Sequence, residues 1–481
     1  RPQPRSSDAD RRYGFQDTMT CEVHSALEWG MLGVARGILD NFLRFYVRDD
    51  GAVSYRGPET ANSALLLTLL AKYYSYSRDA SLLLDHFTKT KAVVAWLNAS
   101  RAQSLTYPAS DPRYGIPIGD SEADNFVRVV GAPHFAPATP PLHYYASAAA
   151  TSRGFLELGR VWRTLGAAHS HDEMLSLAAH MTDTAALLRR DLHASMNRTV
   201  VNDSKGGRCW PFLADPLTPC PTPHATNSEI TPWRSYSEMF YHGMLSKQVI
   251  TDVYANLGQN GLLRLGAIGP SNIWFAFVLH GFGFALLQHD LVSEFLLQFY
   301  AHSAHSYTRG TWTTPEGVFL DRDQAATPYS APAEQTVPLY LRWALVFEDI
   351  DAEALWLAKA LPREWLSDGE RVVVKGAPTR YGRLTMELQS KLANCTVLAN
   401  ITLPQEWAAP DARPAGGLIL RLRAPAPHTG KLQAVTVGGA SVGSSSIDAE
   451  QETVAFAPAA LTDAVRTGME AVVATFGGCD A

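Results

Sequence analysis

Long apolar runs are missing from this chain of 481 residues. The longest one, from Ile273 to Leu287, is interrupted by His280 and is shorter than the roughly 18 to 20 residues that a membrane-spanning helix needs. We therefore expect no transmembrane segment. Instead, this stretch predicts a buried helix over residues 272–288.

Excess positive charge is missing as well, because 41 Lys and Arg residues face 47 Asp and Glu residues and the net charge is −6. Proteins that bind phosphate backbones usually carry clustered Lys and Arg, so nucleic acid is not an expected partner. Neither a Walker loop nor a dinucleotide fingerprint occurs. We expect no cofactor and no metal; a zinc site at His302 and His305, three residues apart, is the alternative.

Cysteine is scarce, with five residues, and the odd number leaves one thiol unpaired unless another chain supplies its partner. Cys209 and Cys220 flank a Pro-rich loop. We expect them to form a disulfide, because the prolines restrict the loop and closure spans only about eleven residues. Zinc binding is the competing interpretation, but these cysteines lack the close ligand spacing of zinc sites.

Acceptor motifs for N-glycosylation occur five times, whereas the Ser and Thr content would give about two by chance. The excess favours the secretory pathway. Because the chain begins at Arg1 without Met, we expect that a signal peptide or longer segment preceded it. We predict a secreted or extracellular cell-surface glycoprotein. The acceptors, expected on exposed surface, are Asn98, Asn197, Asn202, Asn394 and Asn400.

Apolar residues recur at i, i+3 and i+4 from about residue 22 to residue 348, which predicts successive helices. Short turns near Arg78 and Ala167 make some neighbours antiparallel. Every second connection between the helices is long and rich in aromatic and acidic residues. If the helical hairpins form a ring, these long connections lie together around one cavity. These connections are residues 48–60, 104–142, 198–232 and 307–332.

After Ile350 the apolar residues alternate in short segments separated by turn residues, which predicts an antiparallel β-sandwich of about eight strands. We therefore predict a mainly α plus β fold with two domains. The helical domain covers residues 1–350, and the sandwich covers residues 351–481.

Five segments stand out along the chain: GDSEADNF from Gly119, LHYYASAAATSRGFLELGRVWRTLG from Leu142, HSYTRGTWTTPEGVFLD from His305, AEQTVPLYLRWALVFED from Ala333 and the junction from Glu353. They resemble the six-hairpin, (α/α)6-toroid glycosidases, in particular rhamnosidase-like proteins with a trailing β-sandwich. The resemblance implies glycan hydrolysis by paired carboxylates and a carbohydrate substrate or glycan ligand. It also implies a possible upstream domain or partner chain of the same precursor, since relatives often carry a further β-domain before the toroid.

Cleavage of a glycosidic bond needs one carboxylic acid that protonates the leaving oxygen and one carboxylate that activates water or attacks the anomeric carbon. Asp120, Glu122 and Asp124 lie within five residues of one long loop, where mutual repulsion raises proton affinity. We assign Glu122 as the general acid. Alternatively, Asp120 or Asp124 caps the next helix and Glu122 is solvated, or the cluster binds calcium.

The rhamnosidase-like pattern places the second carboxylate shortly after an aromatic and threonine run, a position that Glu316 fits. Tyr307 and Trp312 could stack on a sugar ring, and Arg309 could orient a carboxylate. Glu316 could instead be an ordinary surface residue beside a turn glycine.

Other residues complete the predicted site. Glu229 and Glu334 are reserve candidates for the base if Glu316 faces away. Trp210 and Trp233 are expected near the cavity mouth, held there by the Cys209 to Cys220 loop, whereas Trp274 could equally be packed in the core.

Two hypotheses of different kinds follow. The first is an exo-acting, inverting glycoside hydrolase with Glu122 as acid and Glu316 as base. The second is a catalytically inactive toroid that serves as a structural or glycan-binding component of a cell-surface or extracellular assembly. A polysaccharide lyase is a third possibility, but its Tyr, His and Arg residues are not identifiable from the sequence.

Overall fold

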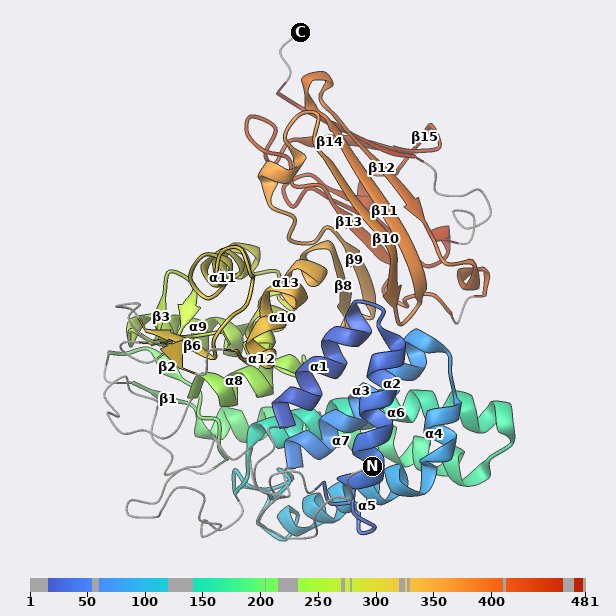
Figure 1. Ribbon diagram of the computed structural model, residues 1–481, viewed down its shortest axis with the longest axis vertical. Helices are drawn as coiled ribbons and strands as arrows, with labels where there is room; N and C mark the ends of the chain where they lie inside the picture. Colours follow the sequence, from blue (N-terminus) through green and yellow to red (C-terminus); the bar gives the residue numbers. More distant parts are fainter. Residues whose placement is uncertain are drawn as a thin grey trace. The chain divides into compact units, whose positions relative to one another are not determined.

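The protein is represented by a computed structural model, drawn in Figure 1. By contacts the chain divides into two units, a helical unit and a sandwich unit, which are described separately. The helical unit comprises Arg1–Ala26, Met31–Ala285 and Tyr300–Val337, and the sandwich unit comprises Leu27–Gly30, Leu286–Phe299 and Pro338–Ala481. The structure describes residues 16–53, 60–119, 142–203, 205–214, 232–269, 273–276, 279–319, 325–326, 329–409, 412–461 and 471–478.

Most of the described helices lie in the helical unit, while parts of α1, α10, α11 and α13 belong to the sandwich unit. Their bounds are α1 Gln16–Glu28, α2 Leu32–Phe45, α3 Thr60–Ser77, α4 Ser81–Asp85, α5 Phe87–Ser104, α6 Tyr145–His169, α7 Asp172–Thr199, α8 Pro232–Tyr241, α9 Lys247–Gln259, α10 His280–Gln288, α11 Val292–His305, α12 Ala331–Glu334 and α13 Thr336–Leu345.

Helices α6 and α7 form an antiparallel hairpin at the short turn predicted near residue 167 (Figure 1). Helix α6 ends at Ser170, which adopts a left-handed conformation with φ 51°. Helix α7 then begins at once, because the side chain of His171 accepts the amide of Met174 at 3.3 Å and caps the first turn. On its other side α6 packs closely on α3, since a Cβ atom at Gly154 would lie 2.5 Å from the carbonyl oxygen of Ala64.

The long connections of the helical unit build a small sheet, which we call the loop sheet and which the sequence did not predict. The expected helix over residues 272–288 is wrong in its first part, because Ile273, Trp274 and Phe275 form β5 and the helix begins only at His280. β-Branched and aromatic residues favour this pairing with β6 over a helix. The sheet has the order β3-β4-β5-β6-β7, with bounds β3 Leu263–Arg264, β4 Ala267–Ile268, β5 Ile273–Phe275, β6 Gly317–Phe319 and β7 Ala325–Ala326. A separate pair joins β1 Val201–Asn202 to β2 Arg208–Cys209.

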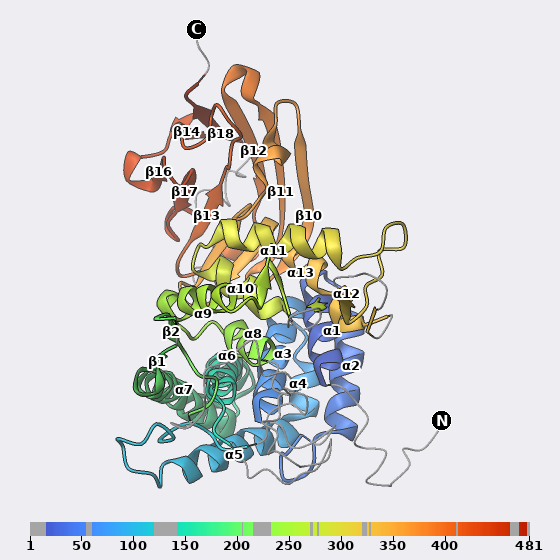
Figure 2. The same ribbon diagram turned by 90° about the vertical axis from the view of Figure 1, so that its left-hand side faces the viewer.

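The sandwich unit contains two sheets with the orders β10-β11-β12-β18-β14-β15 and β16-β17-β13-β9-β8 (Figure 2). All described pairs in them are antiparallel except β9 with β13. The bounds are β8 Val346–Asp349, β9 Ala354–Leu357, β10 Arg371–Thr379, β11 Gly382–Lys391, β12 Thr396–Thr402, β13 Leu418–Arg421, β14 Leu432–Val437, β15 Ala440–Ser441, β16 Ile447–Asp448, β17 Thr453–Phe456 and β18 Val472–Phe476.

One apolar core lies between these sheets. Leu384, Met386 and Leu388 of β11 alternate with more exposed residues and pack with Leu355 and Leu420 from the other sheet. This two-residue period is the pattern that predicted a sandwich after residue 350. The predicted fold class, mainly α followed by a β-sandwich, is confirmed.

The last turn of α1 belongs to the sandwich unit, and the polar contacts of Glu28 hold it there. The Trp343 indole donates to Glu28 Oε1 at 3.1 Å, and Arg342 Nη2 lies 3.4 Å from Glu28 Oε2. All three residues are buried. By contacts the sandwich unit therefore takes in α13 from Pro338 onward and strand β8, whereas the sequence boundary was placed at residue 350.

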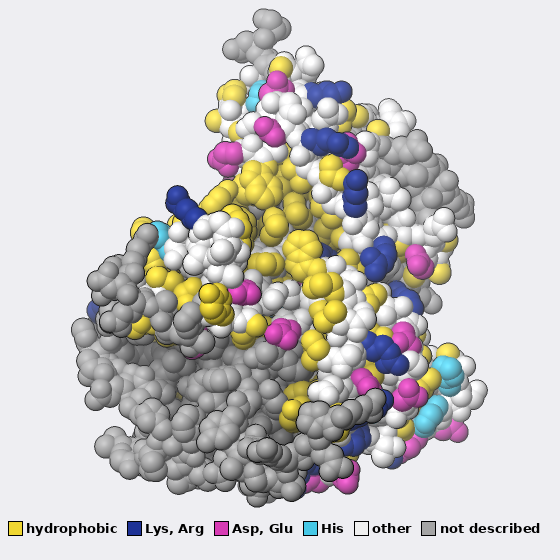
Figure 3. All heavy atoms as spheres, viewed as in Figure 1, with side chains coloured by type: hydrophobic (Ala, Val, Ile, Leu, Met, Phe, Trp, Pro, Cys, Tyr) yellow, Lys and Arg dark blue, Asp and Glu magenta, His cyan; other side chains and the backbone are white. Residues whose placement is uncertain are grey.

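Charged side chains of both signs are interspersed among the described residues on the face shown in Figure 3. This mixture accords with the small net charge of −6.

Candidate functional site

Tyr307 anchors the late loop of the helical unit at the position where the sequence predicted a sugar-stacking aromatic. Its ring is 9% exposed. Its hydroxyl donates toward the carbonyl oxygens of Glu334, at 2.6 Å, and Ala333, at 3.0 Å, and accepts the amide of Val337 at 3.3 Å. Burial raises the pKa of Tyr307 well above its usual value. The Tyr307 hydroxyl therefore stays protonated near pH 7 and links this loop to helices α12 and α13 through hydrogen bonds.

Trp312 projects from the tip of the same loop. It is 64% exposed, and its ring centroid lies 6.3 Å from that of Tyr307. The backbone of Trp312 has φ 56°, a left-handed conformation that is unusual for a bulky residue. Two backbone hydrogen bonds hold this turn: Thr308 donates to Thr313 O at 2.8 Å, and Trp312 donates to Thr308 O at 3.0 Å.

Glu316 lies immediately before strand β6 and is partly buried. Its carbonyl oxygen accepts the amide of Ala276 at 3.2 Å, and the next residue, Gly317, pairs with Phe275 of β5. A Cβ atom at Gly317 would lie 2.7 Å from Ile273 Cδ1, so a larger residue here would displace the Ile273 side chain. The loop sheet thus fixes the backbone that carries the predicted base.

Glu334, a reserve candidate, ends the short helix α12 in the same layer of loops. Ser330 donates its amide to Thr314 O at 3.1 Å, and Glu334 donates its amide to Ser330 O at 3.0 Å. Because the Tyr307 hydroxyl also bonds the Glu334 carbonyl, the segments that carry Glu316 and Glu334 share one hydrogen-bonded framework. Both carboxylate residues are partly buried. We call this framework, residues 307–316 with 329–337, the loop layer.

The remaining predicted site residues are placed as follows. Arg309 is exposed at the loop tip. Trp210 is buried, and its indole donates to Asp252 Oδ2 at 2.8 Å while Arg208 lies over its ring. Trp233 lies in the first turn of α8, and its side chain is outside the described part of the structure. Residues Asp120, Glu122, Asp124, Cys220 and Glu229 also lie outside the described residues.

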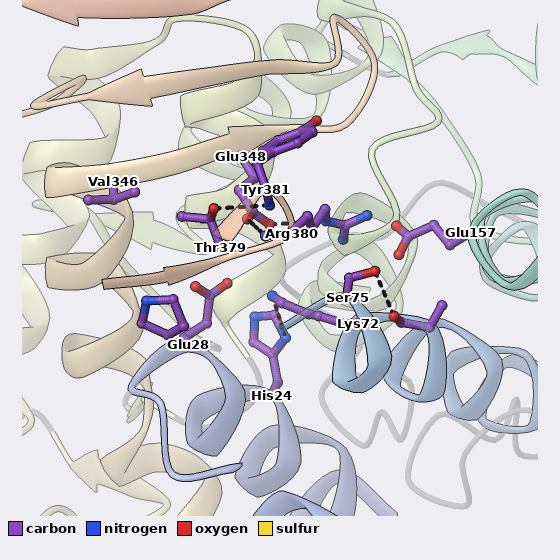
Figure 4. Close-up of polar contacts among 12 residues, drawn as sticks. His24, Glu28, Lys72, Ser75, Glu157, Val346, Glu348, Thr379, Arg380 and Tyr381 are labelled. Carbon is purple, nitrogen blue, oxygen red and sulfur yellow. Dashed lines mark hydrogen bonds and ion pairs between the residues drawn. The ribbon is translucent and has the colours of Figure 1, made fainter. Parts of the chain in front are cut away.

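A group of buried polar side chains, which sequence reasoning missed, lies among the helices of the same unit. We call His24, Lys72, Arg153, Glu157 and Tyr241 the buried cluster; each is at most 6% exposed. Lys72 Nζ lies 3.5 Å from His24 Nδ1 (Figure 4). Tyr241 OH lies 2.6 Å from the same nitrogen. Where Lys72 carries its ammonium group, His24 Nδ1 accepts from it, because an ammonium nitrogen has no acceptor site.

Arg153 joins helices α6 and α8 within this cluster. Its Nε bonds Glu157 Oε1 at 2.6 Å, and its Nη1 donates to the carbonyl oxygen of Tyr241 at 2.6 Å. The guanidinium carbon also lies 5.1 Å from the centre of the Tyr241 ring. A polar residue within an apolar helix, such as Lys72 in LLLTLLAKYY, was the signal in the sequence that could have indicated such a cluster.

Two more buried histidines adjoin the cluster. Burial lowers the pKa of His280 to about 4. The pKa of His242 is lowered well below its usual value, first by burial and then by the positive charge of Arg153. Both imidazoles are therefore neutral near pH 7. The sulfur of the buried residue Cys21 lies 3.7 Å from His280 Nδ1.

The predicted glycosylation sites differ in accessibility. Asn98 is half-buried on α5, and the hydroxyl of Ser100, the third residue of its motif, donates to Ile118 O. The other four, Asn197, Asn202, Asn394 and Asn400, are exposed. Because Cys220 lies outside the described residues, its pairing with Cys209 stays a prediction.

Within the described ranges, no group of three or more His, Cys, Asp or Glu side chains could hold a metal ion. None of the helices in that part of the chain is long and apolar enough to cross a membrane.

No known protein family and no curated protein matches the chain. Solved structures do resemble it. They include the GH78 rhamnosidase of Bacillus sp. GL1, with 12% identity and TM-score 0.45, which covers 82% of this chain and 38% of that one. A metal-independent alpha mannosidase of Streptococcus pneumoniae, complexed with alpha-1,6-mannobiose, has 13% identity, TM-score 0.41 and coverage of 68% and 84%.

The GH76 alpha-mannanase of Bacteroides thetaiotaomicron has 13% identity, TM-score 0.38 and coverage of 69% and 86% of the two chains. The solved structures that resemble this chain thus include a rhamnosidase, a mannosidase and a mannanase. At these identities and TM-scores we take no chemistry from them, and the function is argued from the residues.

Proposed function

We propose that this chain is a glycoside hydrolase-like glycoprotein that releases terminal sugars from a glycan with inversion, by means of two carboxylates. One observation carries the proposal. The loop layer combines a partly buried carboxylate residue, Glu316, with an exposed aromatic ring, Trp312, and a rigidly held one, Tyr307. Sugar-binding sites need an aromatic surface for the apolar face of the ring and a fixed carboxylate for the chemistry.

In the proposed reaction Glu122, as a carboxylic acid, gives its proton to the glycosidic oxygen as the bond to the anomeric carbon breaks. Glu316, as a carboxylate, takes a proton from the water that attacks that carbon from the opposite face. Inversion calls for a separation of about 6.5 to 9.5 Å between the two carboxyl groups. Glu334 is the alternative base, because it belongs to the same hydrogen-bonded framework.

The first prediction is that Glu122→Gln and Glu316→Gln each lower monosaccharide release from a panel of defined glycans by at least about a hundredfold. Glu173→Gln on α7 is the matched control, because Glu173 is exposed and pairs with Lys91. If Glu334→Gln abolishes release while Glu316→Gln does not, the base is Glu334. Unchanged release by all three site variants would overturn the assignment.

The alternative is the inactive toroid that binds glycans or serves as a scaffold. It would be supported if the wild-type protein binds members of the panel and releases no sugar from any of them. A lyase is not proposed. The structure does bring Tyr241, His24 and Arg153 together, but these side chains are only 1 to 2% exposed and present no surface to a polymer.

Secretion and glycosylation belong to the same proposal. Four exposed acceptor asparagines support it, because glycosylation requires an accessible acceptor. An upstream domain or partner chain of the same precursor is part of the proposal too. Intact-mass analysis of native-source material before and after glycosidase treatment tests the secretory assignment, and an unchanged mass would refute it.

A further inference from the structure

Two strongly exposed aromatic side chains lie on neighbouring segments of the loop layer. Trp312 is 64% exposed, and Tyr329 is 75% exposed. The hydrogen bond from the Ser330 amide to Thr314 O, 3.1 Å long, joins the two segments two residues after Trp312 and one residue after Tyr329. The Cα atoms of the two aromatic residues therefore lie at most roughly 16 Å apart. A short oligosaccharide can span this separation.

Hydrogen bonds within the loop keep the Trp312 side chain exposed to solvent. Besides its two backbone bonds, the hydroxyl of Thr308 lies 2.7 Å from the Thr311 hydroxyl and 2.9 Å from the Thr313 hydroxyl. These contacts stabilise a turn in which Trp312 keeps φ 56°, a conformation with a steric cost for any residue that has a Cβ atom. Strain that the surrounding structure maintains, on a large apolar side chain left in water, indicates a binding role.

The surroundings of Trp312 favour a sugar over a lipid or a protein partner. Its neighbours at the loop tip are Thr308, Arg309 and Thr311, all of them exposed and able to hydrogen-bond. Apolar neighbours would be expected around a membrane anchor or a protein hot spot. A pyranose ring has one apolar C–H face and a rim of hydroxyl groups, which match an aromatic face beside hydroxyl and guanidinium donors.

We propose that Trp312 and Tyr329 form a glycan-binding platform on the helical unit, with Trp312 stacking on a pyranose ring and Tyr329 contacting a neighbouring sugar. The sequence did not indicate Tyr329. The inference rests on the proposed function in that it assigns the substrate class to the same loop layer. Neutral and acidic glycans share this ring chemistry, and the exposed Arg309 is the group that would distinguish them.

The second prediction concerns this platform and is tested by native electrophoresis through gels that contain yeast mannan, dextran or polygalacturonate. We expect at least one polysaccharide to retard the full-length protein. Trp312→Gly and Tyr329→Ala should each weaken that retardation at least about tenfold. The control Phe45→Ala removes a 60% exposed aromatic ring from α2 and should change nothing. If only polygalacturonate retards the protein and Arg309→Gln loses this retardation, the ligand is an acidic glycan. If mannan or dextran retards the protein and Arg309→Gln keeps this retardation, the ligand is a neutral glycan.

Three outcomes would overturn the platform. In the first, none of the three gels retards the wild type. In the second, the wild type and both platform variants are retarded equally. In the third, the wild type sediments with phosphatidylcholine–phosphatidylserine vesicles and Trp312→Gly does not. The proposed function fails separately. If Glu122→Gln, Glu316→Gln and Glu334→Gln all retain hydrolysis while Trp312→Gly loses retardation, the carboxylate assignment is wrong and the platform stands.

Discussion

At the scale of single residues, Trp312 has two energetically unfavourable features that most surface residues lack. Its ring is largely in water, and its backbone lies in the left-handed region at φ 56°. Ser170 has a similar φ of 51°, but there the conformation ends helix α6, a common structural use of such a residue. At Trp312 the left-handed conformation belongs to the hydrogen-bonded turn that places the ring in solvent.

The third prediction compares Trp312→Gly with Trp312→Ala. Both variants remove the ring and its contact with Tyr307, but only glycine adopts the left-handed conformation without a Cβ clash. We expect Trp312→Gly to be more stable than Trp312→Ala by about 1 kcal/mol. Urea denaturation measures the difference. Equal stability, or a more stable alanine variant, would show that the backbone at this position is not strained in solution.

At the scale of elements, the helical unit uses buried polar contacts between helices as well as apolar packing. Arg153 of α6 is 1% exposed and bonds both Glu157 on its own helix and the carbonyl of Tyr241 on α8. Polar groups buried this deeply require partners, because an unpaired one has lost its hydration. The contact between α6 and α8 therefore depends on Arg153.

The fourth prediction is that Arg153→Met destabilises the protein by about 3 to 5 kcal/mol, since it breaks the buried ion pair between Arg153 and Glu157. Arg44→Met on α2 is the control. Arg44 also pairs with an acidic residue of its own helix, Asp40, but its side chain is 61% exposed, and we expect a loss below about 1 kcal/mol. Chemical denaturation of both variants checks this, and similar losses would contradict a special role for the buried pair.

Elements also show where sequence reasoning fails. The 3.6-residue period predicted the α6–α7 hairpin, and the two-residue period predicted the strands after residue 350. The helix expected over residues 272–288 was partly wrong because the short strand β5 is stabilised by pairing with β6, more than 40 residues later. Such pairing leaves no periodic signal in either segment.

At the scale of the whole molecule, the buried histidines of the helical unit should lower the stability of the folded state as the solution becomes acidic. His280 has its pKa lowered to about 4 by burial, and the pKa of His242 is lowered by burial and by Arg153. In the unfolded chain a histidine titrates near 6.5. Between about pH 6.5 and pH 4 the unfolded state therefore binds more protons than the folded state, and stability falls as the pH falls.

The fifth prediction is that the thermal midpoint of the wild type decreases from pH 7 to pH 4.5 and that His280→Gln shows a smaller decrease. Groups around His280 that share its environment are Cys21, His24, Tyr241 and His242. His169→Gln replaces an exposed histidine and should keep the wild-type slope. Differential scanning fluorimetry across this range provides the measurement. A slope that His280→Gln leaves unchanged would contradict the assignment.

The sequence by itself determined the order of a helical part and a sandwich, because periods of 3.6 and two residues are local properties of the chain. Its motifs also indicated the late loop with Tyr307, Trp312 and Glu316. Only the tertiary structure joined Glu334 and Tyr329 to that loop, and only it brought His24, Lys72 and Tyr241 together from α1, α3 and α8. These groupings depend on contacts between residues far apart in the chain, and the physical reason they form is that buried polar groups must find partners wherever packing places them.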